Sequence, residues 1–375
     1  MNVVLFEHPR SKSQEHFNDV ANAPLSACLT TGYVAAALDG DGIQVEIYDA
    51  YLAGHSFSAA GQRIAGSGCD VLGVHAVYFW EQTDRLFELL AAVKAADADV
   101  FIVLYGIFPS SFSRQILAAY TCIDAVIIGE PEQVFVELVN QLQKNAGTVA
   151  GSISGLVYRQ AGRTLAGPPR PLIDPLDRLA FPVRSTLSLN AVGVSVLGSR
   201  GCTGRCSFCC VNSFYGREAA WRGRSPANIV AEVTQVLSLV QERYVYFLDA
   251  DFFGPAKSVH TRVRHLCDLL GDLKLSFGLE CRSTDISEKV VQPLAAAGLK
   301  HVFLGIESAS KAALKRMRKA AGPDRSAVAV ELLRSYGIEP NVGFIMFGPD
   351  TSLDDVRINF DFLKMCGLLE RLHTS

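Results

Sequence analysis

The stretch "GSRGCTGRCSFCCVN", residues 198–212, contains four cysteines within nine positions and directly follows the apolar run "VGVSVL". Three of them, Cys202, Cys206 and Cys209, have the spacing C-x3-C-x2-C. Three thiolates on a glycine-containing loop can each bind a different iron of a cubane iron–sulfur cluster, so that the fourth iron keeps no protein ligand. The spacing therefore predicts a 4Fe-4S cluster with one open iron, and it leaves Cys210 as a packed thiol beside the site.

Two other interpretations of these cysteines stay open. Structural zinc uses four ligands, commonly arranged as two pairs, but the sequence offers no second cysteine or histidine pair of that kind. Four buried small residues are the second alternative, and they would not explain why the cysteines follow a strand-like run. The iron–sulfur interpretation accounts for both the spacing and the position.

Composition narrows the class of protein. The 375 residues are 49% hydrophobic and carry a formal net charge of −3, so the chain can bury two cores and has no general field that would attract a nucleic acid. We expect the basic run at 315–319 to be a solvent-exposed helix face. The opening "MNVVLFEHPR" is too short for a signal peptide, and "VLGVHAVYFW" is about half a membrane span. The sequence predicts a cytoplasmic protein with reduced cysteines and no membrane or nucleic-acid partner.

The first half alternates β-branched runs with helical patterns such as "EQTDRLFELLAAVKAA". Nearly continuous hydrophobicity is typical of parallel strands that helices cover on both faces. The expected strands are residues 2–6, 44–50, 70–79, 99–106 and 124–130. We therefore predict an α/β doubly wound parallel sheet over residues 1–145.

The next segment breaks this rhythm. Residues 151–167 predict a hairpin that turns at Ala161 and Gly162, and "PPRPLIDPLDRLAFPVR" is a proline-rich connector. We expect residues 146–190 to form a linker between two domains.

The second half restarts the alternation over residues 191–375. Strands are expected at 193–197, 244–249, 274–280, 300–306 and 341–347, and Ser225-Pro226 predicts the start of the first intervening helix. Five strand–helix units in series predict a partial parallel barrel with its chemistry at the C-terminal ends of the strands. We expect a sixth strand to be missing, because the chain stops at "LLERLHTS".

These motifs resemble the radical S-adenosylmethionine (SAM) enzymes, in which C-x3-C-x2-C follows the first barrel strand. In that family SAM chelates the open iron, and an electron from the cluster cleaves SAM to a 5′-deoxyadenosyl radical. The segments "YFLDADFFG", "LECRS", "LGIES" and "GFIMFGPDT" extend the resemblance, although Asp350 stands where the family often has glutamate. The resemblance implies SAM-site residues Asp249, Asp251, Arg282, Glu307, Ser308, Gly343 and Ile345.

A parallel sheet ahead of such a barrel resembles the cobalamin-dependent branch of the family. There the corrin lies over the C-terminal edge of the first sheet, and glycines allow its close approach. The loops after the strands then imply cobalamin contacts from His8, Pro9, Val77, Tyr78, Gly106, Ile107, Gly129 and Glu130. The loop "FEHPRS" lacks the aspartate and glycine of a D-x-H-x-x-G motif, and His75 lies within an apolar run that suggests a core histidine. We therefore expect base-off cobalamin without histidine ligation.

The resemblance implies a methyltransferase that acts on an unactivated carbon of a small molecule. One SAM would methylate cobalamin, and a second would yield the radical that removes a hydrogen from the substrate. An electron donor of the flavodoxin or ferredoxin type is implied as the partner. Ring-forming or oxidative members of the branch are the main alternative.

Two further alternatives stay open. Methylthiotransferases bind a second cluster in their first domain through three cysteines. Here Cys69 and Cys122 precede the third and fifth strands, at the edge opposite the ligand side, and Cys28 lies in a helical pattern, so all three suggest buried small residues. A cobalamin or redox sensor would need a cluster but no SAM motifs.

Overall fold

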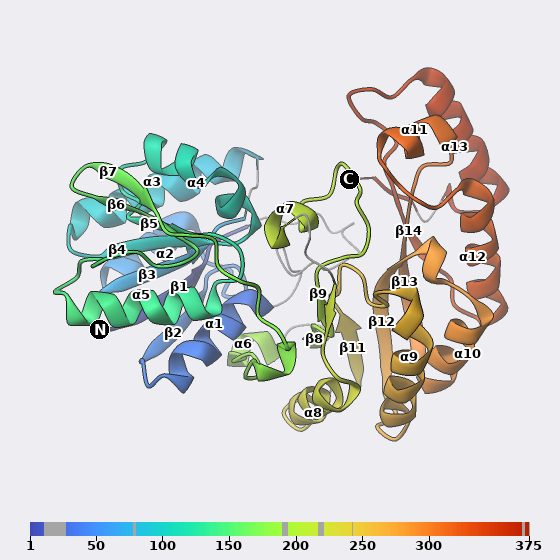
Figure 1. The fold of residues 1–375 in the computed structure, drawn as a ribbon, viewed down its shortest axis with the longest axis horizontal. Helices are drawn as coiled ribbons and strands as arrows, with labels where there is room; N and C mark the ends of the chain where they lie inside the picture. Colours follow the sequence, from blue (N-terminus) through green and yellow to red (C-terminus); the bar gives the residue numbers. More distant parts are fainter. Residues whose placement is uncertain are drawn as a thin grey trace.

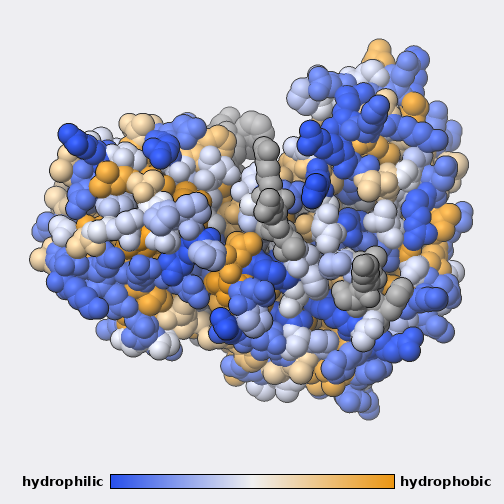
Figure 2. Space-filling model, viewed as in Figure 1, coloured by the Kyte–Doolittle hydropathy of each residue, from blue (hydrophilic) through white to orange (hydrophobic). Residues whose placement is uncertain are grey.

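The structure is a computed structural model, and we describe residues 1–10, 28–77, 80–189, 194–216, 221–241, 243–369 and 372–374. Within these ranges two sheets carry the fold, one in each half of the chain (Figure 1). Hydrophilic side chains cover most of the visible face of the second half, with apolar ones scattered among them (Figure 2). No helix of the described part is long and apolar enough to span a membrane.

The first sheet has the strand order β2-β1-β3-β4-β5-β6-β7, and its first five members are parallel. These five strands are β1 (Val3–Glu7), β2 (Val45–Asp49), β3 (Val71–His75), β4 (Phe101–Tyr105) and β5 (Ala125–Ile127). The helices are α1 (Leu29–Gly40), α2 (Phe57–Ala65), α3 (Trp80–Ala96), α4 (Ile107–Ala119) and α5 (Glu132–Lys144). Separate apolar clusters pack on the two faces, so the doubly wound sheet is confirmed.

The predicted hairpin forms, and it extends this sheet instead of standing apart as a linker. Strands β6 (Leu156–Gln160) and β7 (Arg163–Ala166) pair antiparallel, and β6 also pairs antiparallel with β5. Ala161 and Gly162 both have positive φ, 48° and 74°, as a two-residue hairpin turn of the primed type requires.

The second sheet has the order β15-β14-β13-β12-β11-β8, with parallel neighbours throughout. Its strands are β8 (Val194–Val196), β11 (Tyr244–Phe247), β12 (Ser276–Arg282), β13 (Leu299–Glu307), β14 (Asn341–Phe344) and β15 (Leu372–Thr374). The longer helices beside them are α8 (Pro226–Leu237), α9 (Ala256–Gly271), α10 (Glu288–Ala297), α12 (Pro323–Ser335) and α13 (Leu353–Met365). Ser225 caps α8 as predicted, since its side chain accepts a hydrogen bond from the Asn228 amide.

The expectation of a missing sixth strand is wrong. Strand β15 pairs parallel with β14 in the register Val342↔Leu372 to Phe344↔Thr374. The segment is only three residues long and polar in sequence, so no hydrophobic periodicity announces it. Its backbone pairs with the otherwise open edge of β14.

Short elements complete the described chain around the cysteines and between the sheets. They are η1 (Leu176–Arg178), α6 (Thr186–Leu189), β9 (Ser199–Arg200), α7 (Val211–Tyr215), β10 (Arg222–Gly223), η2 (Ser283–Asp285) and α11 (Lys311–Arg316).

Candidate functional site

The cysteines lie on a loop, residues 201–210, between β9 and α7; we refer to it as the cluster loop. A methyl group built on Gly204 would lie 3.3 Å from Cys202 Sγ and 3.8 Å from Cys206 Sγ, so the two thiols flank this glycine closely. The Gly204 amide lies 3.3 Å from Cys202 Sγ. Hydrogen bonds from backbone N–H groups to the cysteine sulfurs tune the reduction potential of an iron–sulfur cluster, and the cluster loop can supply one from Gly204.

The electrostatics hold the three predicted ligands in the protonated thiol form when no metal is bound. Burial raises the pKa of the Cys202 thiol to about 12, and the negative charge of Asp251 adds to the effect. Burial likewise raises the pKa values of Cys206 and Cys209. A metal cation displaces such protons, because a coordinating thiol is deprotonated. Cys210 is exposed, so the prediction that it is a packed thiol is wrong.

Two contacts tie the cluster loop to distant parts of the second half. The Ser207 amide donates to Met317 O (2.9 Å), and its hydroxyl donates to Arg316 O (3.1 Å). On the opposite side the Asn212 side chain donates to Gly204 O (2.9 Å). The loop is therefore held at both flanks.

Asp249 and Asp251 follow β11 and hold the strand-to-loop connection. Asp249 is fully buried and accepts a hydrogen bond from the Ser199 hydroxyl, and burial raises its pKa to about 6. Asp251 accepts from the Thr203 amide (3.0 Å) and hydroxyl (2.7 Å) and lies 3.6 Å from Cys202 Sγ. Both carboxylates therefore position the start of the cluster loop, and their predicted contact with SAM stays a prediction.

Arg282 ends β12 close to the cysteines. Its guanidinium donates to Asp285 over 2.9 and 2.8 Å and lies 3.5 Å from Asp251. The residue ends a half-buried strand, but the chain itself supplies its anionic partners. Arg282 therefore does not need an external carboxylate as its partner, although its position beside Cys202 keeps it a candidate SAM contact.

Glu307 is held in an unusual backbone conformation at the end of β13. Its φ is +70°, a region that costs free energy for any residue except glycine. The Ile345 amide donates to Glu307 O (2.8 Å), and Lys319 Nζ lies 3.0 Å from Glu307 Oε1. A methyl group on Gly305 would lie 2.8 Å from Oε1, and one on Gly343 would lie 3.8 Å from Oε2. Several constraints thus fix this carboxylate beside Cys206 and Cys209.

One member of the basic run corrects an expectation. The run comprises Lys315, Arg316, Arg318 and Lys319. Arg318 and Lys315 are exposed, but the Lys319 side chain is only 7% exposed and pairs with Glu307. The solvent-exposed assignment is wrong for Lys319, which sequence alone could not separate from its neighbours.

Ser308 faces the interior. Its hydroxyl donates to Asn359 Oδ1 (2.8 Å) and accepts from the Ser310 amide (3.1 Å), and the residue is 1% exposed. Ser308 fixes the turn into α11, and the structure gives its hydroxyl no access to a ligand.

His8 follows β1 at the C-terminal edge of the first sheet, and its side chain is completely buried. Nδ1 lies 2.9 Å from Pro9 O, and Nε2 accepts from the Val77 amide (3.3 Å). Burial, with the charge of Arg10, lowers the pKa of His8 to about 4, so the ring is neutral near pH 7. Both ring nitrogens are engaged by backbone. Tyr78, the next predicted contact, lies outside the described residues.

Two glycines with positive φ lie at the same edge of the first sheet. Gly106 precedes Ile107 at the start of α4 with φ +114°, and a methyl group there would lie 3.0 Å from His75 Cδ2. Gly129 has φ +75°, and its amide donates to Ser110 Oγ (3.1 Å). Both positions require glycine, as the sequence predicts.

Glu130 serves another purpose than the one predicted. Its carboxylate accepts hydrogen bonds from Arg200, Arg222 and the Ile173 amide. These partners belong to the second half and to the segment before it. Its acceptor capacity is therefore largely consumed within the protein, and its predicted contact with cobalamin stays a prediction.

A buried charged network that the sequence did not reveal lies under this edge. Glu7 accepts from Arg10 (3.0 Å) and from Thr31, and its carboxylate lies 3.0 Å from His75 Nδ1. Burial opposes the charge on His75, but Cys28 and Glu7 outweigh it and raise its pKa to about 10. His75 is thus buried, as expected of a core histidine, but it is a charged member of the network. In the sequence, this network could have been inferred from the opposite charges of Glu7 and Arg10, which lie three residues apart at the end of a strand.

Glu7, Cys28 and His75 also bring three potential metal-ligand atoms within 4.8 Å of one another. However, the Arg10 guanidinium already lies 3.0 Å from the same carboxylate, and Thr31 uses its other oxygen. A cation here would face the positive charge of Arg10. We interpret the group as an internal ion-pair network.

Arg10 provides a test of whether this edge fits a bound group. Its side chain is buried, yet Nε and Nη2 have no hydrogen-bond partner in the described structure. Buried donors normally have a partner, so these atoms fit an acceptor from a bound molecule. Amide or phosphate oxygens, such as cobalamin carries, are suitable acceptors.

The first-domain cysteines do not form a second cluster site. Cys28, Cys69 and Cys122 are all buried, as predicted. Cys28 Sγ lies 3.3 Å from His75 Nδ1 at the C-terminal end of β3, whereas Cys69 precedes the same strand at its other end. The geometry separates these thiols.

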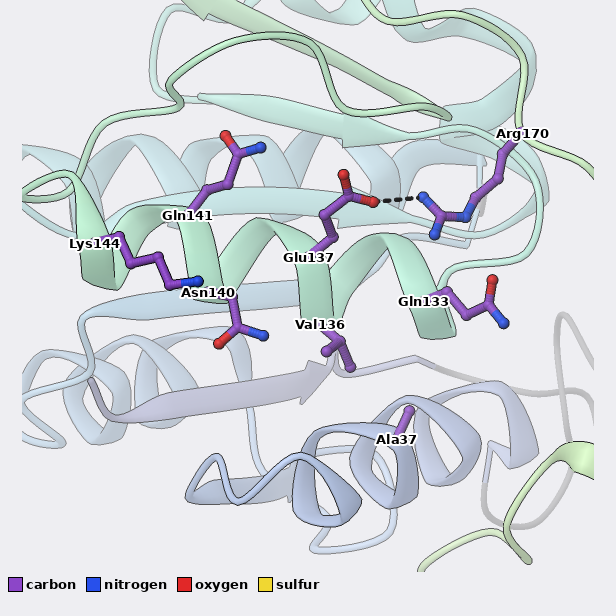
Figure 3. A pocket seen from close by; sticks show the side chains of 8 residues that line it. All are labelled: Ala37, Gln133, Val136, Glu137, Asn140, Gln141, Lys144 and Arg170. Carbon is purple, nitrogen blue, oxygen red and sulfur yellow. Dashed lines mark hydrogen bonds and ion pairs between the residues drawn. The ribbon is translucent and has the colours of Figure 1, made fainter.

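A cavity of about 550 Å³ lies elsewhere, between α1 and α5 (Figure 3). Its lining includes Ala37, Gln141 and the ion pair of Arg170 with Glu137 (2.8 Å), and contains none of the predicted site residues. We do not assign it to the site.

Comparison with known proteins agrees with this geometry. Residues 196–363 match the radical SAM superfamily. An uncharacterised methyltransferase of Pyrococcus horikoshii is 28% identical over 97% of this chain and 78% of its own length. The anaerobic magnesium-protoporphyrin IX monomethyl ester cyclase of Rubrivivax gelatinosus is 28% identical over 92% of this chain, which spans 62% of that protein.

Two solved structures resemble the whole chain. The cobalamin-dependent SAM radical enzyme OxsB, with aqua-cobalamin and SAM bound, matches with a TM-score of 0.77 and 22% identity over 96% of this chain and 51% of its own. The radical SAM methyltransferase TsrM from Kitasatospora setae matches with a TM-score of 0.76 and 19% identity over 98% of this chain and 71% of its own.

Over residues 196–363, the chain therefore resembles the radical SAM superfamily. Over almost its whole length it has the fold of the cobalamin-dependent radical SAM enzymes.

Proposed function

We propose that the protein is a cobalamin-dependent radical SAM methyltransferase that methylates an unactivated carbon of a small molecule. The observation that carries the proposal is the cluster loop, with Cys202 and Cys206 beside Gly204 and Cys209 on the same loop, in a chain that follows the fold of OxsB and TsrM over at least 96% of its length. Methyltransferases also occur among the relatives, including one that acts on cytidylyl-2-hydroxyethylphosphonate. We place the first domain at residues 1–145 together with the hairpin strands β6 and β7, which extend its sheet. The rest of residues 146–190 is the connector, and the second domain is residues 191–375.

In this proposal Cys202, Cys206 and Cys209 hold a [4Fe–4S] cluster. A bound cluster supplies the electron that cleaves SAM to a 5′-deoxyadenosyl radical, and bound cobalamin supplies the methyl carrier. The contribution of the chain is positional. Glu307, fixed by Lys319 and by its backbone, presents an acceptor for the amino or ribose groups of SAM, and Gly343 and Ile345 line the adjacent strand end.

At the first sheet, Gly106 and Gly129 let the backbone approach a flat macrocycle, and Arg10 offers two unused donors to its polar substituents. Val77, Ile107 and Pro9 border this edge. His8 stays engaged with backbone and does not ligate cobalt. A cytoplasmic location and a flavodoxin or ferredoxin-type electron donor complete the proposal.

The product distinguishes methylation from its main alternative. Cyclase relatives favour ring formation or oxidation as the second candidate. The reconstituted protein should be supplied with trideuteromethyl-SAM, reductant and candidate small molecules, and the products analysed by mass spectrometry. A labelled methyl group on the product supports methylation, whereas loss of hydrogen without label supports the alternative.

A further inference from the structure

Four buried charged residues join the two halves of the molecule. Glu130 and Glu132 follow β5 in the first half, whereas Arg200 lies in β9 and Arg222 in β10 of the second. Arg200 lies 2.9 Å from Glu130 and 2.5 Å from Glu132, and Arg222 lies 3.1 Å from both oxygens of Glu130. We refer to these four residues as the interface ion-pair group.

The group is buried and balanced in charge. Its side chains are between 1% and 9% exposed, and two carboxylates face two guanidinium groups. Burial opposes ionisation of Glu130, but the charges of Arg200 and Arg222 outweigh it and hold the pKa of that carboxyl below its usual range. Buried ion pairs add little net stability, because desolvation offsets their attraction. Their rigid fork geometry does, however, fix how two surfaces meet.

The surfaces that meet here are those of the two candidate sites. Arg200 lies two residues before Cys202, so it fixes the start of the cluster loop. Glu130 directly follows Gly129, and a methyl group on Gly129 would lie 3.8 Å from Phe214 O in α7. Helices α4 and α7, which start beside Gly106 and the cluster loop, also pack on each other. The connector joins the same point, because Arg222 donates to Ile173 O (2.5 Å).

We propose that the interface ion-pair group holds the cluster loop at a set distance from the cofactor edge of the first sheet. Its members are positioning residues: they couple the site of radical formation to the site of methyl transfer and do not touch the reacting atoms. The inference rests on the proposed function, since it assigns the first edge to cobalamin. It also reassigns Glu130 from a corrin contact to an interface residue.

The test compares Glu130→Gln with Glu232→Gln in the reconstituted holoprotein. Glu232 is a matched control, because it is 1% exposed and pairs with two arginines, Arg184 and Arg224. Neither ion pair includes a residue of the first half, although Arg224 Nη1 lies 3.4 Å from Tyr33 Oη in α1. The main readout is electron paramagnetic resonance of samples that contain cob(II)alamin and the reduced cluster, whose magnetic coupling depends on their separation. Hydrogen exchange of residues 199–216 is the second readout and needs no cofactor.

We expect a single coupling in the wild type and in Glu232→Gln, and a broadened, weaker coupling with faster loop exchange in Glu130→Gln. SAM cleavage should persist in Glu130→Gln while methyl transfer to substrate falls on the order of 10²-fold, since small misplacements have effects of that size. If Glu130→Gln does not fold, Glu132→Gln is the second variant, because it leaves Arg200 paired with Glu130 alone. It should likewise weaken the magnetic coupling and speed the exchange of the loop. Coupling and exchange equal to those of Glu232→Gln would overturn the inference. Absence of a cob(II)alamin signal in the wild type would instead refute the proposed function, and the exchange data would still decide the inference.

Discussion

The C-terminal edges of the two sheets solve the problem of cofactor placement differently. At the second edge the important groups are side chains of distinctive chemistry: three thiols on one loop and a carboxylate held beside two of them. At the first edge the charged side chains Glu7, Arg10 and His75 are occupied largely with one another, and the glycines there, Gly106 and Gly129, have positive φ. In the proposed function, the second edge therefore holds its cofactors through the chemistry of its side chains, and the first edge holds cobalamin mainly through the shape of its backbone. This difference explains why the candidate site residues of the second sheet were easier to predict from the sequence than those of the first.

The largest expected effects lie at the second edge. Cys202→Ala, Cys206→Ala or Cys209→Ala should each abolish the brown chromophore and SAM cleavage, because the cluster loses one of its three protein ligands. Cys210→Ala, a matched control on the same loop with an exposed thiol, should keep both. Iron content, visible absorption and deoxyadenosine yield measure the outcome. Equal iron loss in the Cys210 variant would show the ligand assignment to be wrong.

Removal of the Lys319 charge should weaken SAM binding without loss of the cluster. Lys319→Met leaves Glu307 without its cation, and a hydrogen bond to a charged group contributes roughly 1.5–3 kcal/mol, so the KM for SAM should rise about tenfold or more. Lys319→Arg should restore most of the affinity. Lys315→Met, at an exposed position of the same run, is the control. If Lys319→Met and Lys315→Met have the same KM, Lys319 does not position Glu307.

The charged network at the first edge should make the free energy of unfolding depend on pH. The pKa of His75 is raised from 6.5 to about 10 in the folded state, so its contribution to stability is complete below pH 6.5 and is lost as the pH rises toward about 10. We expect the free energy of unfolding to decline across this window by on the order of 2–4 kcal/mol more in the wild type than in His75→Gln. Chemical denaturation at a series of pH values measures it. Parallel curves for the two proteins would contradict a charged His75.

The smallest expected effect concerns His8. Both of its ring nitrogens are engaged by backbone, so the cob(II)alamin form should show no three-line nitrogen splitting on the cobalt signal. Electron paramagnetic resonance of His8→Ala should match that of the wild type. A nitrogen splitting that disappears in His8→Ala would refute base-off binding without histidine.

Local patterns predicted much of the architecture. The five parallel strands of the first sheet, the hairpin at Ala161 and the cap at Ser225 each depend on neighbours in sequence, and all three are confirmed. The three-residue strand β15 was not predicted, because its pairing depends on an open edge of β14 and not on its own composition.

Side-chain roles were less readable where partners lie far apart in the chain. Glu130 meets Arg200 across 70 residues, and Ser308 meets Asn359 across 51, so neither could be separated from a ligand contact by position alone. Lys319 differs from its basic neighbours only through Glu307, 12 residues away. The cysteine spacing was informative because a cluster fixes the separation of its own ligands.

Labelled SAM tests the central claim most directly. The protein, reconstituted with iron, sulfide and reduced cobalamin, should be incubated with trideuteromethyl-SAM and analysed for both cobalamin mass and 5′-deoxyadenosine. The account predicts a trideuteromethyl group on cobalamin, and deoxyadenosine that depends on Cys202, Cys206 and Cys209. Deoxyadenosine without labelled cobalamin would contradict the assignment of the first sheet, and the absence of both would contradict the proposed function.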